Sequence, residues 1–329
     1  RTTVPVQGQL LRVSASVGAA TPCGNGPVDA ETSGADLLRF AEAAMFEAKR
    51  RGPGRVALAN AALIASAGSQ MYLEGQLRDA LAGPPEASGL ILHFQPVVGP
   101  DGTVLTAEAL VRWQHPDRGL LAPSVFLPVA EQGDLLGELD RWVLRAALGA
   151  AARWPRRVAV AVNLAGLVPG DPDFVDEITA AVDAVGIAWH RVVLELVETS
   201  LADLPAPGLS AMAELVARGV RFAVDDFGTG YSSLARLKDL PAQVIKVDRR
   251  FVAGIDTDPS DFAVVRAVVD MALAMGRRCV AEGVETATQF RALRGLGVHA
   301  YQGWLMSQPV NAAAIRDLLE LGTLRVPDN

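Results

Sequence analysis

The sequence predicts an α/β protein whose larger part is a (β/α)8 barrel of the TIM type, preceded by a small α+β segment. From Leu90 onward, short apolar runs alternate with longer amphipathic stretches, which indicates parallel strands joined by crossover helices. Most of these runs end on a polar residue, usually an acid. The strands of TIM-type barrels have their catalytic residues at the same position, the C-terminal end. The remaining length, about 240 residues, matches one such barrel.

Residues 1–60 predict a small α+β segment that is too short to be a complete domain. Strand-like runs at 9–20 and 55–59 flank a helix at 34–51, whose apolar residues recur with a helical period. A Gly-Pro-Gly sequence ends this helix. Residues 61–85 predict a connecting helix that stops at a Gly-Pro-Pro sequence, so we expect the barrel to occupy residues 86–324.

The barrel strands are predicted from apolar runs that each carry polar residues near the end: AEAL with Glu108, VAVAVN with Asn163, VVLELVE with Glu195 and Glu198, RFAVDD with Asp225 and Asp226, QVIKVD with Lys246 and Asp248, CVAE with Glu282 and HAYQGW with Gln302. The predicted helices lie at 134–153, 173–186, 206–218, 260–276, 286–295 and 311–321. A doubly wound open sheet is the competing arrangement. No GxGxxG follows a first strand, so we favour the barrel.

The spacing of the polar residues restricts how they can meet. Lys246 and Asp248 are two positions apart, so they share one face of a strand. Glu195 and Glu198 are three positions apart and point to opposite faces. We therefore expect only one glutamate of this pair in the barrel interior, with the other past the end of the strand.

Asp225 and Asp226 are adjacent, so both reach one site only if the strand finishes there and the backbone turns. Gly228 and Gly230 permit such a turn, because glycine adopts backbone conformations that other residues avoid. We therefore expect the strand to end at this pair of aspartates.

The acids of these strands imply bound cations if they converge. Only Lys246 and Arg112 supply positive charge to balance these acids, and carboxylates so close together cannot all stay ionised. Carboxylate and amide oxygens suit Mg²⁺ or Mn²⁺. The sequence therefore predicts a site for divalent metal ions at one end of the barrel.

Composition argues against several other classes of protein and of binding site. A net charge of −7 argues against non-specific nucleic-acid binding. The two cysteines, Cys23 and Cys279, share no CxxC spacing and the four histidines share no ligand spacing, so neither a disulfide framework nor a zinc site is indicated. No apolar run approaches the length of a membrane span, and the N-terminus lacks both an initiator Met and a signal-peptide core. We expect a cytoplasmic segment of a longer protein, whose missing upstream part could carry a membrane anchor.

The motifs along residues 90–322 resemble the EAL domain, the phosphodiesterase of bacterial cyclic di-GMP signalling. The matching segments are FQPVV at 94–98, EAL at 108–110, VNLA at 162–165, LELVE at 194–198, DDFGTGYSSL at 225–234, IKVD at 245–248, AEGVE at 281–285 and QGW at 302–304. The resemblance implies metal-dependent hydrolysis of cyclic di-GMP to linear pGpG. The chain departs from the usual pattern at Ala165, Val197 and Trp304, none of which is an implied ligand.

The resemblance also implies a role for each site residue. The implied metal ligands are Glu108, Asn163, Glu195, Asp225, Asp226 and Asp248. Besides Glu108, the implied catalytic groups are Lys246 on the attacking water, Glu282 as a base or metal ligand and Gln302 as a water-orienting amide. The implied substrate contacts are Gln95, Leu110, Arg112 and Asp248, with Arg112 on a phosphate. Asp248 could instead be an ion-pair partner of Lys246.

A loop after the aspartate pair is implied to couple metal binding to formation of a homodimer. Glu198 matches the residue that steadies this loop, whose matched positions include Phe227, Gly228, Thr229 and Gly230. The larger Ca²⁺ ion, which prefers more ligands, is expected to occupy the acids without supporting fast hydrolysis.

Residues 1–60 resemble the C-terminal half of a GGDEF diguanylate cyclase domain, through VSASVGAA at 13–20 and GADLLRFAEAAMFEAKRRGPGRV at 34–56. The cyclase signature loop is absent from this sequence. We therefore expect no cyclase activity from these residues.

Two other functions stay open at this point. Some EAL proteins keep the pocket but act as cyclic di-GMP receptors or scaffolds, and these usually lack a metal-binding acid or the lysine. An unrelated metal-dependent barrel enzyme would share the acid-tipped strands but would not need DDFGTGYSSL.

Overall fold

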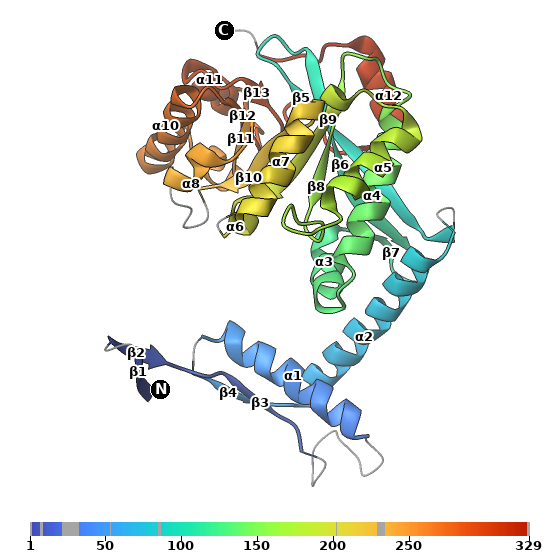
Figure 1. The fold of residues 1–329 in the computed structure, drawn as a ribbon, viewed down its shortest axis with the longest axis vertical. Coiled ribbons are helices and arrows are strands. Elements are labelled where there is room, and N and C mark those ends of the chain that lie inside the picture. The colour runs from blue at the N-terminus through green and yellow to red at the C-terminus, as the bar shows by residue number, and fades with distance from the viewer. Residues whose placement is uncertain are drawn as a thin grey trace. The chain divides into compact units, whose positions relative to one another are not determined.

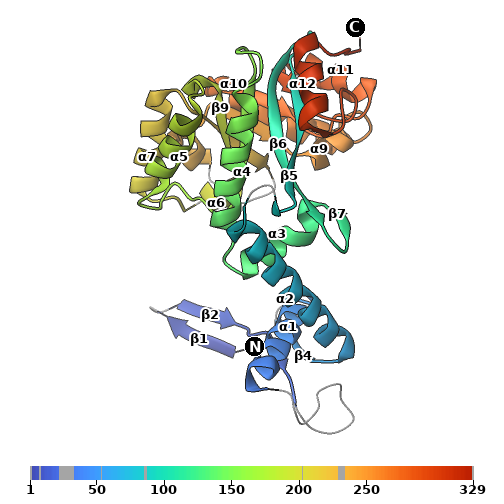
Figure 2. The same ribbon diagram turned by 90° about the vertical axis from the view of Figure 1, so that its right-hand side faces the viewer.

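The computed structural model describes residues 2–6, 9–21, 33–52, 54–84, 87–201, 203–228 and 234–327. The chain divides into two compact units, Arg1–Asp79 and Ala80–Asn329. Figures 1 and 2 show both units as ribbons, and each is described below by itself.

The smaller unit consists of short strands and one packed helix. Strands β1 (Thr2–Val6) and β2 (Gln9–Val13) form an antiparallel pair, and β3 (Val17–Ala19) runs parallel to β4 (Val56–Leu58). The predicted strand at 9–20 is therefore two strands, separated at residues 14–16. Helix α1 (Gly34–Arg50) packs on β3 so closely that a Cβ at Gly18 would meet the backbone of Ala41.

Helix α1 matches its predicted bounds because its ends carry local signals. The Ser33 side chain accepts a hydrogen bond from the amide of Asp36 and so caps the first turn. Gly52, with a φ of 112°, follows the last turn. Helix α2 (Ala61–Ala82) then occupies most of the predicted connecting segment.

The larger unit is a closed barrel of eight strands, which confirms the predicted fold class. In spatial order the strands are β5 (Leu90–Val98), β6 (Val104–His115), β8 (Ala159–Leu164), β9 (Val192–Val197), β10 (Arg221–Phe227), β11 (Val244–Val247), β12 (Arg278–Ala281) and β13 (Ala300–Tyr301), which closes on β5. Two short strands, β7 (Gly119–Leu121) and β14 (Val310–Asn311), pair with β6 and β5.

Strand β5 departs from the expected parallel arrangement, because it runs antiparallel to both of its barrel neighbours. The reason is its connection to β6, which is a tight turn with no crossover helix. The amide of Gly99 donates to the carbonyl of Thr103 at 2.8 Å, and Gly102 takes a φ of 82°. Such a short turn can join only antiparallel strands.

Helices cover the outside of the barrel, as Figures 1 and 2 show. The six predicted helices appear as α4 (Leu136–Ala151), α5 (Phe174–Val185), α7 (Ala206–Arg218), α10 (Pro259–Ala274), α11 (Ala287–Gly295) and α12 (Ala312–Leu321). The periodicity did not identify α3 (Pro123–Gln132), α6 (Glu198–Leu201), α8 (Leu234–Asp239) and α9 (Arg249–Ala253). Three of these are too short for a period to show, and α3 contains the helix breaker Pro128.

A layer of small and branched apolar side chains fills the middle of the barrel. It consists of Val97, Ala159, Ala161, Val193, Ala223, Val244, Val280 and Ala300. Two positions after the last layer residue of each parallel strand from β8 to β13 comes a polar residue, so period-two alternation turns it into the same interior. The apolar layer therefore supports a polar layer at the C-terminal ends of the strands.

Among the helices of the described residues, none combines the length and the apolar character that crossing a membrane requires.

Candidate active site

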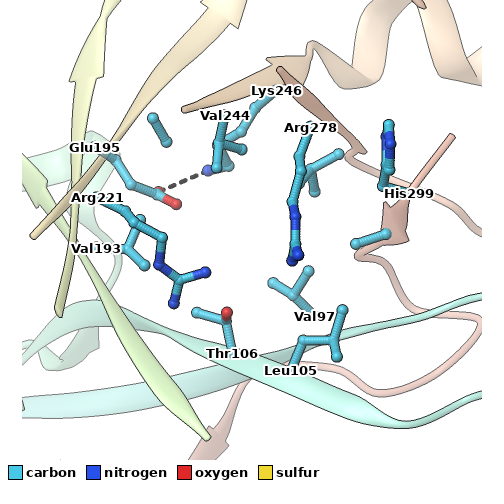
Figure 3. A pocket seen from close by; sticks show the side chains of 13 residues that line it. Val97, Leu105, Thr106, Val193, Glu195, Arg221, Val244, Lys246, Arg278 and His299 are labelled. Carbon is cyan, nitrogen blue, oxygen red and sulfur yellow. Dashed lines mark hydrogen bonds and ion pairs between the residues drawn. The ribbon is translucent and has the colours of Figure 1, made fainter. Parts of the chain in front are cut away.

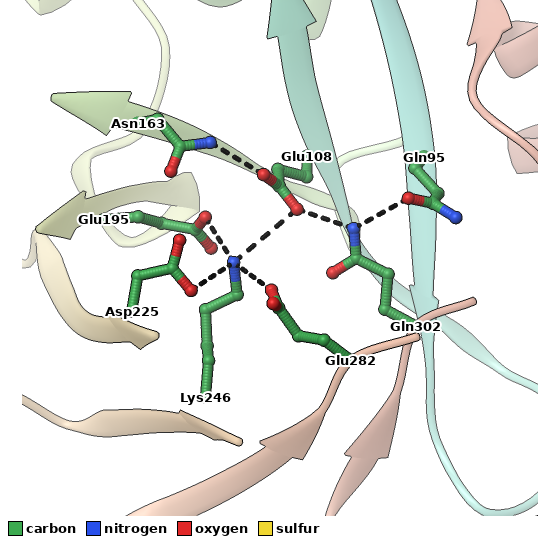
Figure 4. A network of polar contacts seen from close by, with 8 residues as sticks. All are labelled: Gln95, Glu108, Asn163, Glu195, Asp225, Lys246, Glu282 and Gln302. Atoms are coloured by element: carbon green, nitrogen blue, oxygen red, sulfur yellow. Dashed lines mark hydrogen bonds and ion pairs between the residues drawn. The ribbon is translucent and has the colours of Figure 1, made fainter. Parts of the chain in front are cut away.

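Lys246 lies at the centre of the polar layer, surrounded by carboxylates (Figure 4). Its Nζ atom is 2.6 Å from Glu195 Oε2, 3.2 Å from Asp225 Oδ1 and 3.6 Å from Glu108 Oε2. Glu282 Oε1 makes the shortest contact, at 2.5 Å. Only 2% of the lysine side chain is exposed, so its charge is balanced by these acids and not by water.

Glu108 is held in place by two side-chain amides. Asn163 donates to its Oε1 at 2.7 Å, and Gln302 donates to its Oε2 at 2.6 Å. The same Gln302 nitrogen also donates to Gln95 Oε1 at 3.1 Å, and Gln95 in turn donates to the Ser307 carbonyl at 3.0 Å. Neutral donors therefore orient a buried carboxylate that Lys246 only partly neutralises.

The adjacent aspartates reach the site through a bulge, and the strand does not end there as predicted. Strand β10 continues to Phe227, but its pairing with β11 shifts register between Val224 and Phe227. Asp226 takes a φ of 54°, a left-handed conformation that is uncommon for residues other than glycine. The extra residue turns both carboxylates toward one side. The backbone therefore turns already at Asp226, ahead of Gly228, which was expected to permit the turn.

Asp226 and Asp248 form a carboxyl pair at the edge of the site. Burial, the charge of Asp225 and a side-chain hydrogen bond with Asp248 raise the pKa of Asp226 to about 6. Burial opposes ionisation of Asp248, but hydrogen bonds from Arg250 and Asp226 hold its pKa below the usual value. Asp248 also caps α9, since it accepts from the amide of Arg250 at 2.6 Å. Its ion pair is with Arg250, at 3.2 Å, in place of the alternative with Lys246.

The electrostatics of the layer follow from burial and crowding. Burial raises the pKa of Glu282 to about 8, with Lys246 opposing the rise and neighbouring acids adding to it. Burial also raises the pKa of Glu195 well above its usual value. Burial alone would lower the pKa of Lys246, but the surrounding carboxylates outweigh it and raise that pKa. The layer therefore has more negative charge than its one lysine neutralises.

The donor set fits divalent metal ions. Carboxylate oxygens of Asp225, Asp226 and Glu282 all lie within 4.8 Å of one another. Within the described residues, the buried Gln302 Oε1 accepts no hydrogen bond, and the buried Asp225 Oδ1 has only its ion pair with Lys246. Buried oxygens without donors are costly, and a cation or its water would satisfy them. Oxygen ligands of this kind are those that Mg²⁺ and Mn²⁺ prefer.

Glu195 and Glu198 separate as their spacing predicts. Glu195 lies within β9 in the barrel interior, and Glu198 follows the strand as the first residue of α6. The buried Glu198 carboxylate accepts from the amide of Gly228 at 2.9 Å. Gly228 takes a φ of 97° directly after the buried Phe227. The contact fixes the start of the loop after β10, whose predicted residues Thr229 and Gly230 lie outside the described residues.

The predicted substrate contacts lie along β5 and β6. Leu110 and Arg112 occupy the same face of β6 as Glu108, two and four positions further along the strand, and both are half-buried. Gln95 is the register partner of Glu108 on β5. Arg112 donates to the Val111 carbonyl at 2.8 Å. Among the described residues no carboxylate forms an ion pair with Arg112, which leaves its charge for an anionic ligand.

Sequence reasoning missed Asp140, which supports the end of β8. This buried residue of α4 accepts hydrogen bonds from the amides of Ala165, Gly166 and Leu167 at 2.7–2.9 Å. Burial raises the pKa of Asp140, while these three bonds oppose the rise. The loop that they hold follows directly after Asn163 and Leu164. An acid on the apolar face of an amphipathic helix was the signal that could have identified it.

Arg277 was also missed, and it holds the C-terminal end of α8. Its buried guanidinium donates to the carbonyls of Leu237 and Leu240, at and just after the end of α8. Gln289 similarly closes a capping box on α11 and donates to the Ala253 carbonyl at 3.2 Å. Neither residue belongs to a recognisable motif, because each acts on backbone that is distant in sequence.

Comparisons with known proteins identify the relatives of this chain. The sequence profile of the EAL domain matches residues 74–309. The bifunctional diguanylate cyclase/cyclic di-GMP phosphodiesterase MucR of Pseudomonas aeruginosa is 38% identical over 312 residues, which cover 92% of this chain and 44% of MucR. The cyclic di-GMP phosphodiesterase NbdA of the same organism is 36% identical over 326 residues, which cover 96% of this chain and 40% of NbdA.

A solved structure agrees with these sequence matches. The PaMucR phosphodiesterase in complex with c-di-GMP is 37% identical and aligns with a TM-score of 0.70, covering 74% of this chain and 99% of that one. The chain thus spans almost the whole of that solved domain but less than half the length of the two curated relatives.

Proposed function

Because the chain belongs to the EAL domain family, we propose that it is a phosphodiesterase that hydrolyses cyclic di-GMP to linear pGpG with the help of bound Mg²⁺ or Mn²⁺. The observation that carries the proposal is the polar layer itself, in which a complete set of acids, amides and one lysine converges from separate strands. The names of the relatives MucR and NbdA support the substrate.

The proposed metal ligands are Glu108, Asn163, Glu195, Asp225, Asp226 and Asp248. Two divalent ions would lower the pKa of a shared water and stabilise the entering and leaving oxygens at phosphorus. The carboxylates come from different strands of one rigid barrel, so the barrel can hold them at fixed distances from one another. The bulge at Asp226 supports the proposal, because an outlying backbone conformation at a cleft is often retained for function.

Lys246, Glu282 and Gln302 are the proposed groups around the attacking water. Lys246 stays protonated, so it can hold an oxygen nucleophile and neutralise charge that develops at phosphorus. Glu282 has its pKa raised to about 8, which suits a group that accepts a proton near neutral pH. The free Oε1 of Gln302 can accept a hydrogen bond from the same water.

The phosphate and guanine contacts are proposed for Gln95, Leu110, Arg112 and Asp248. Arg112 is suited to the phosphate because a guanidinium binds such an oxyanion with two parallel hydrogen bonds. The acids would repel the anionic substrate without bound cations, so the same metal ions would be needed for binding and for chemistry.

The decisive experiment incubates the purified protein with cyclic di-GMP and Mg²⁺ or Mn²⁺ and separates the products by chromatography. We expect pGpG in the samples with metal and none after EDTA treatment. A parallel sample with Ca²⁺ is expected to show little product. Intact nucleotide that nevertheless binds the protein would contradict hydrolysis and indicate the receptor function.

We also propose that residues 1–60 are the C-terminal half of a GGDEF domain, joined to the barrel domain at 86–324 by a linker helix at 61–85. The parallel pair β3 and β4 with α1 packed on it supports an α+β segment. The match to a bifunctional relative extends over 92% of the chain. We expect no diguanylate cyclase product when the protein is incubated with GTP and Mg²⁺.

Regulation through a homodimer is a further proposal, supported by the hydrogen bond between Glu198 and Gly228 at the start of the loop after β10. Activity per protomer should then fall when the protein is diluted through its monomer–dimer transition. Constant activity across that range would contradict it. The proposed location is the cytoplasm, where the substrate is made and both cysteines stay reduced.

A further inference from the structure

A second hollow lies inside the barrel at the N-terminal ends of the strands. Figure 3 shows the side chains that line this cavity of about 60 Å³. Arg221, Val244 and Arg278 line it as the first residues of β10, β11 and β12. Glu195 and Lys246 close it on the side of the polar layer. The cavity is therefore bounded by the two arginines at the N-terminal ends of the strands, by side chains of the apolar layer, and by Glu195 and Lys246 at its inner end.

Small residues leave this space open. Barrel interiors are usually packed by bulky branched side chains. Here the cavity wall includes Ala223 and Ala300, and the same layer contains Ala159 and Ala161. Such a volume admits about four water-sized groups, since one water needs roughly 10–15 Å³, and a cavity with polar walls of that size does not stay empty.

Two arginines from separate strands point into the cavity without an acidic partner. Arg221 donates to the His190 carbonyl at 3.3 Å, while its Nε is buried and makes no hydrogen bond with any described residue. Arg278 forms no ion pair with the described residues. Glu195 is the one carboxylate among the lining residues, and Lys246 already neutralises it at 2.6 Å. The cavity therefore has two positive charges and no free negative one.

The other polar lining groups can also donate. Thr106 contributes a hydroxyl on the wall opposite the arginines. His299 accepts the amide hydrogen of Cys279 at its Nδ1, which places the proton of the neutral ring on Nε2. Burial and the charge of Arg278 lower the pKa of both Arg221 and His299. An anion between the arginines would remove this repulsion and satisfy the buried Nε.

We propose that the N-terminal end of the barrel binds a small tetrahedral oxyanion, such as inorganic phosphate, between Arg221 and Arg278. Guanidinium groups bind phosphate oxygens with paired, charge-assisted hydrogen bonds, and Nε takes part in that pairing. The limited volume excludes a nucleotide or a peptide carboxylate with its chain. Neither arginine is among the proposed phosphodiesterase residues, so the anion site does not depend on that function.

The first test measures thermal unfolding of the intact protein with Mg²⁺ present, in sodium phosphate and in sodium chloride of equal ionic strength. Phosphate at about ten times its dissociation constant is expected to raise Tm by about 3–6 °C. The shift should disappear in Arg221→Gln and in Arg278→Gln. It should persist in the control Arg266→Gln, which changes an exposed arginine of α10 in the same way.

Equal Tm values in the two salts for the unchanged protein would overturn the proposal. A phosphate shift that survives in both cavity variants would also overturn it, because the anion would then bind elsewhere, including at the metal ions. Far-UV circular dichroism checks that each variant folds.

A second measurement uses only the unchanged protein, so it tests the proposal even if a variant fails to fold. Phenylglyoxal modifies accessible arginines, and both Arg278 and Arg266 are exposed. Phosphate is expected to slow modification of Arg278 several-fold relative to chloride while leaving Arg266 unchanged, as read by mass spectrometry of the peptides. Equal protection of both residues, or of neither, would contradict the site.

Discussion

The two ends of the barrel interior carry opposite charge, although the same strands build both. On β10, Arg221, Ala223 and Asp225 share one face, and on β12 Arg278 and Val280 are followed on the same face by Glu282, just after the strand ends. Each of these two strands thus has an arginine at its start, an apolar residue in its middle and an acid at or just past its end. Apolar side chains lie between the arginines and the acids Asp225 and Glu282 along these strands, which is consistent with the proposal that each end binds an ion of opposite sign.

The acid end differs from the arginine end in having an internal counter-ion. Lys246 contacts four carboxylates there, whereas at the other end Arg221 and Arg278 form no ion pair with a carboxylate of the described residues. The acid end therefore contains a cation that neutralises part of its charge, whereas the arginine end contains no corresponding ion pair among the described residues. Changes at the two ends should therefore have effects of different size.

The largest effect is expected from Lys246→Met, which removes the counter-ion of the acid end. Leaving buried carboxylates without their cation should lower the free energy of unfolding by about 3–5 kcal/mol in EDTA at pH 8. Added Mg²⁺ should restore part of the loss. Urea unfolding measures both values, with the exposed Lys238→Met as the matched control. Equal stability of the two variants in EDTA would show that the acids do not need the lysine.

The next largest effect is expected from Glu195→Gln, which keeps the shape of the acid end but removes one ligand charge. Hydrolysis of cyclic di-GMP should fall at least about 100-fold, since loss of a group that merely orients a ligand typically costs 10–100-fold. Initial rates at saturating Mg²⁺ provide the measurement. Glu214→Gln changes an exposed residue of α7 and should keep the full rate. Near-normal turnover in Glu195→Gln would refute the proposed ligand set.

A smaller effect is expected when the pH of the metal-free protein is raised. The pKa of Asp226 is raised to about 6 and that of Glu282 to about 8, so the folded state binds more protons than the unfolded state between pH 5 and 8. The stabilisation from these bound protons is complete below the pKa values that the two acids have in the unfolded chain. It is lost as the pH rises through their pKa values in the folded protein. The free energy of unfolding should fall by about 1 kcal/mol per pH unit across this range.

The same protons compete with metal ions, so stabilisation by Mg²⁺ should increase from pH 6 to pH 8.5. Urea unfolding with EDTA and with Mg²⁺ at each pH tests both statements. A metal-free protein that becomes more stable as the pH rises would contradict the charge crowding at the acid end.

The smallest effect on activity is expected from Arg221→Gln at the opposite end. Among the described residues its guanidinium forms no hydrogen bond or ion pair with the proposed catalytic side chains, so kcat and KM should stay within about twofold of those of the unchanged protein, a change of about 0.4 kcal/mol. A tenfold fall in kcat with normal circular dichroism would show that the two ends are coupled through Glu195 and Lys246.

Local patterns in the sequence were sufficient for most of the fold. Near-continuous apolar runs located the strands, and helical periodicity located six covering helices within about two residues of their ends. The polar residues at the strand ends could be identified as one group because parallel strands of a barrel bring their C-terminal ends together. These features depend on neighbours in the chain, so the chain alone determines them.

Only the tertiary structure decided how the site residues meet. Glu108 and Gln302 are 194 positions apart, and no local pattern could show that one would donate to the other at 2.6 Å. The left-handed turn at Asp226 depends on the pairing of β10 with β11, and the anchoring role of Asp140 depends on the packing of α4 against β8. The opposed charges at the two ends became visible only after closure of the barrel, because closure sets which strand faces converge.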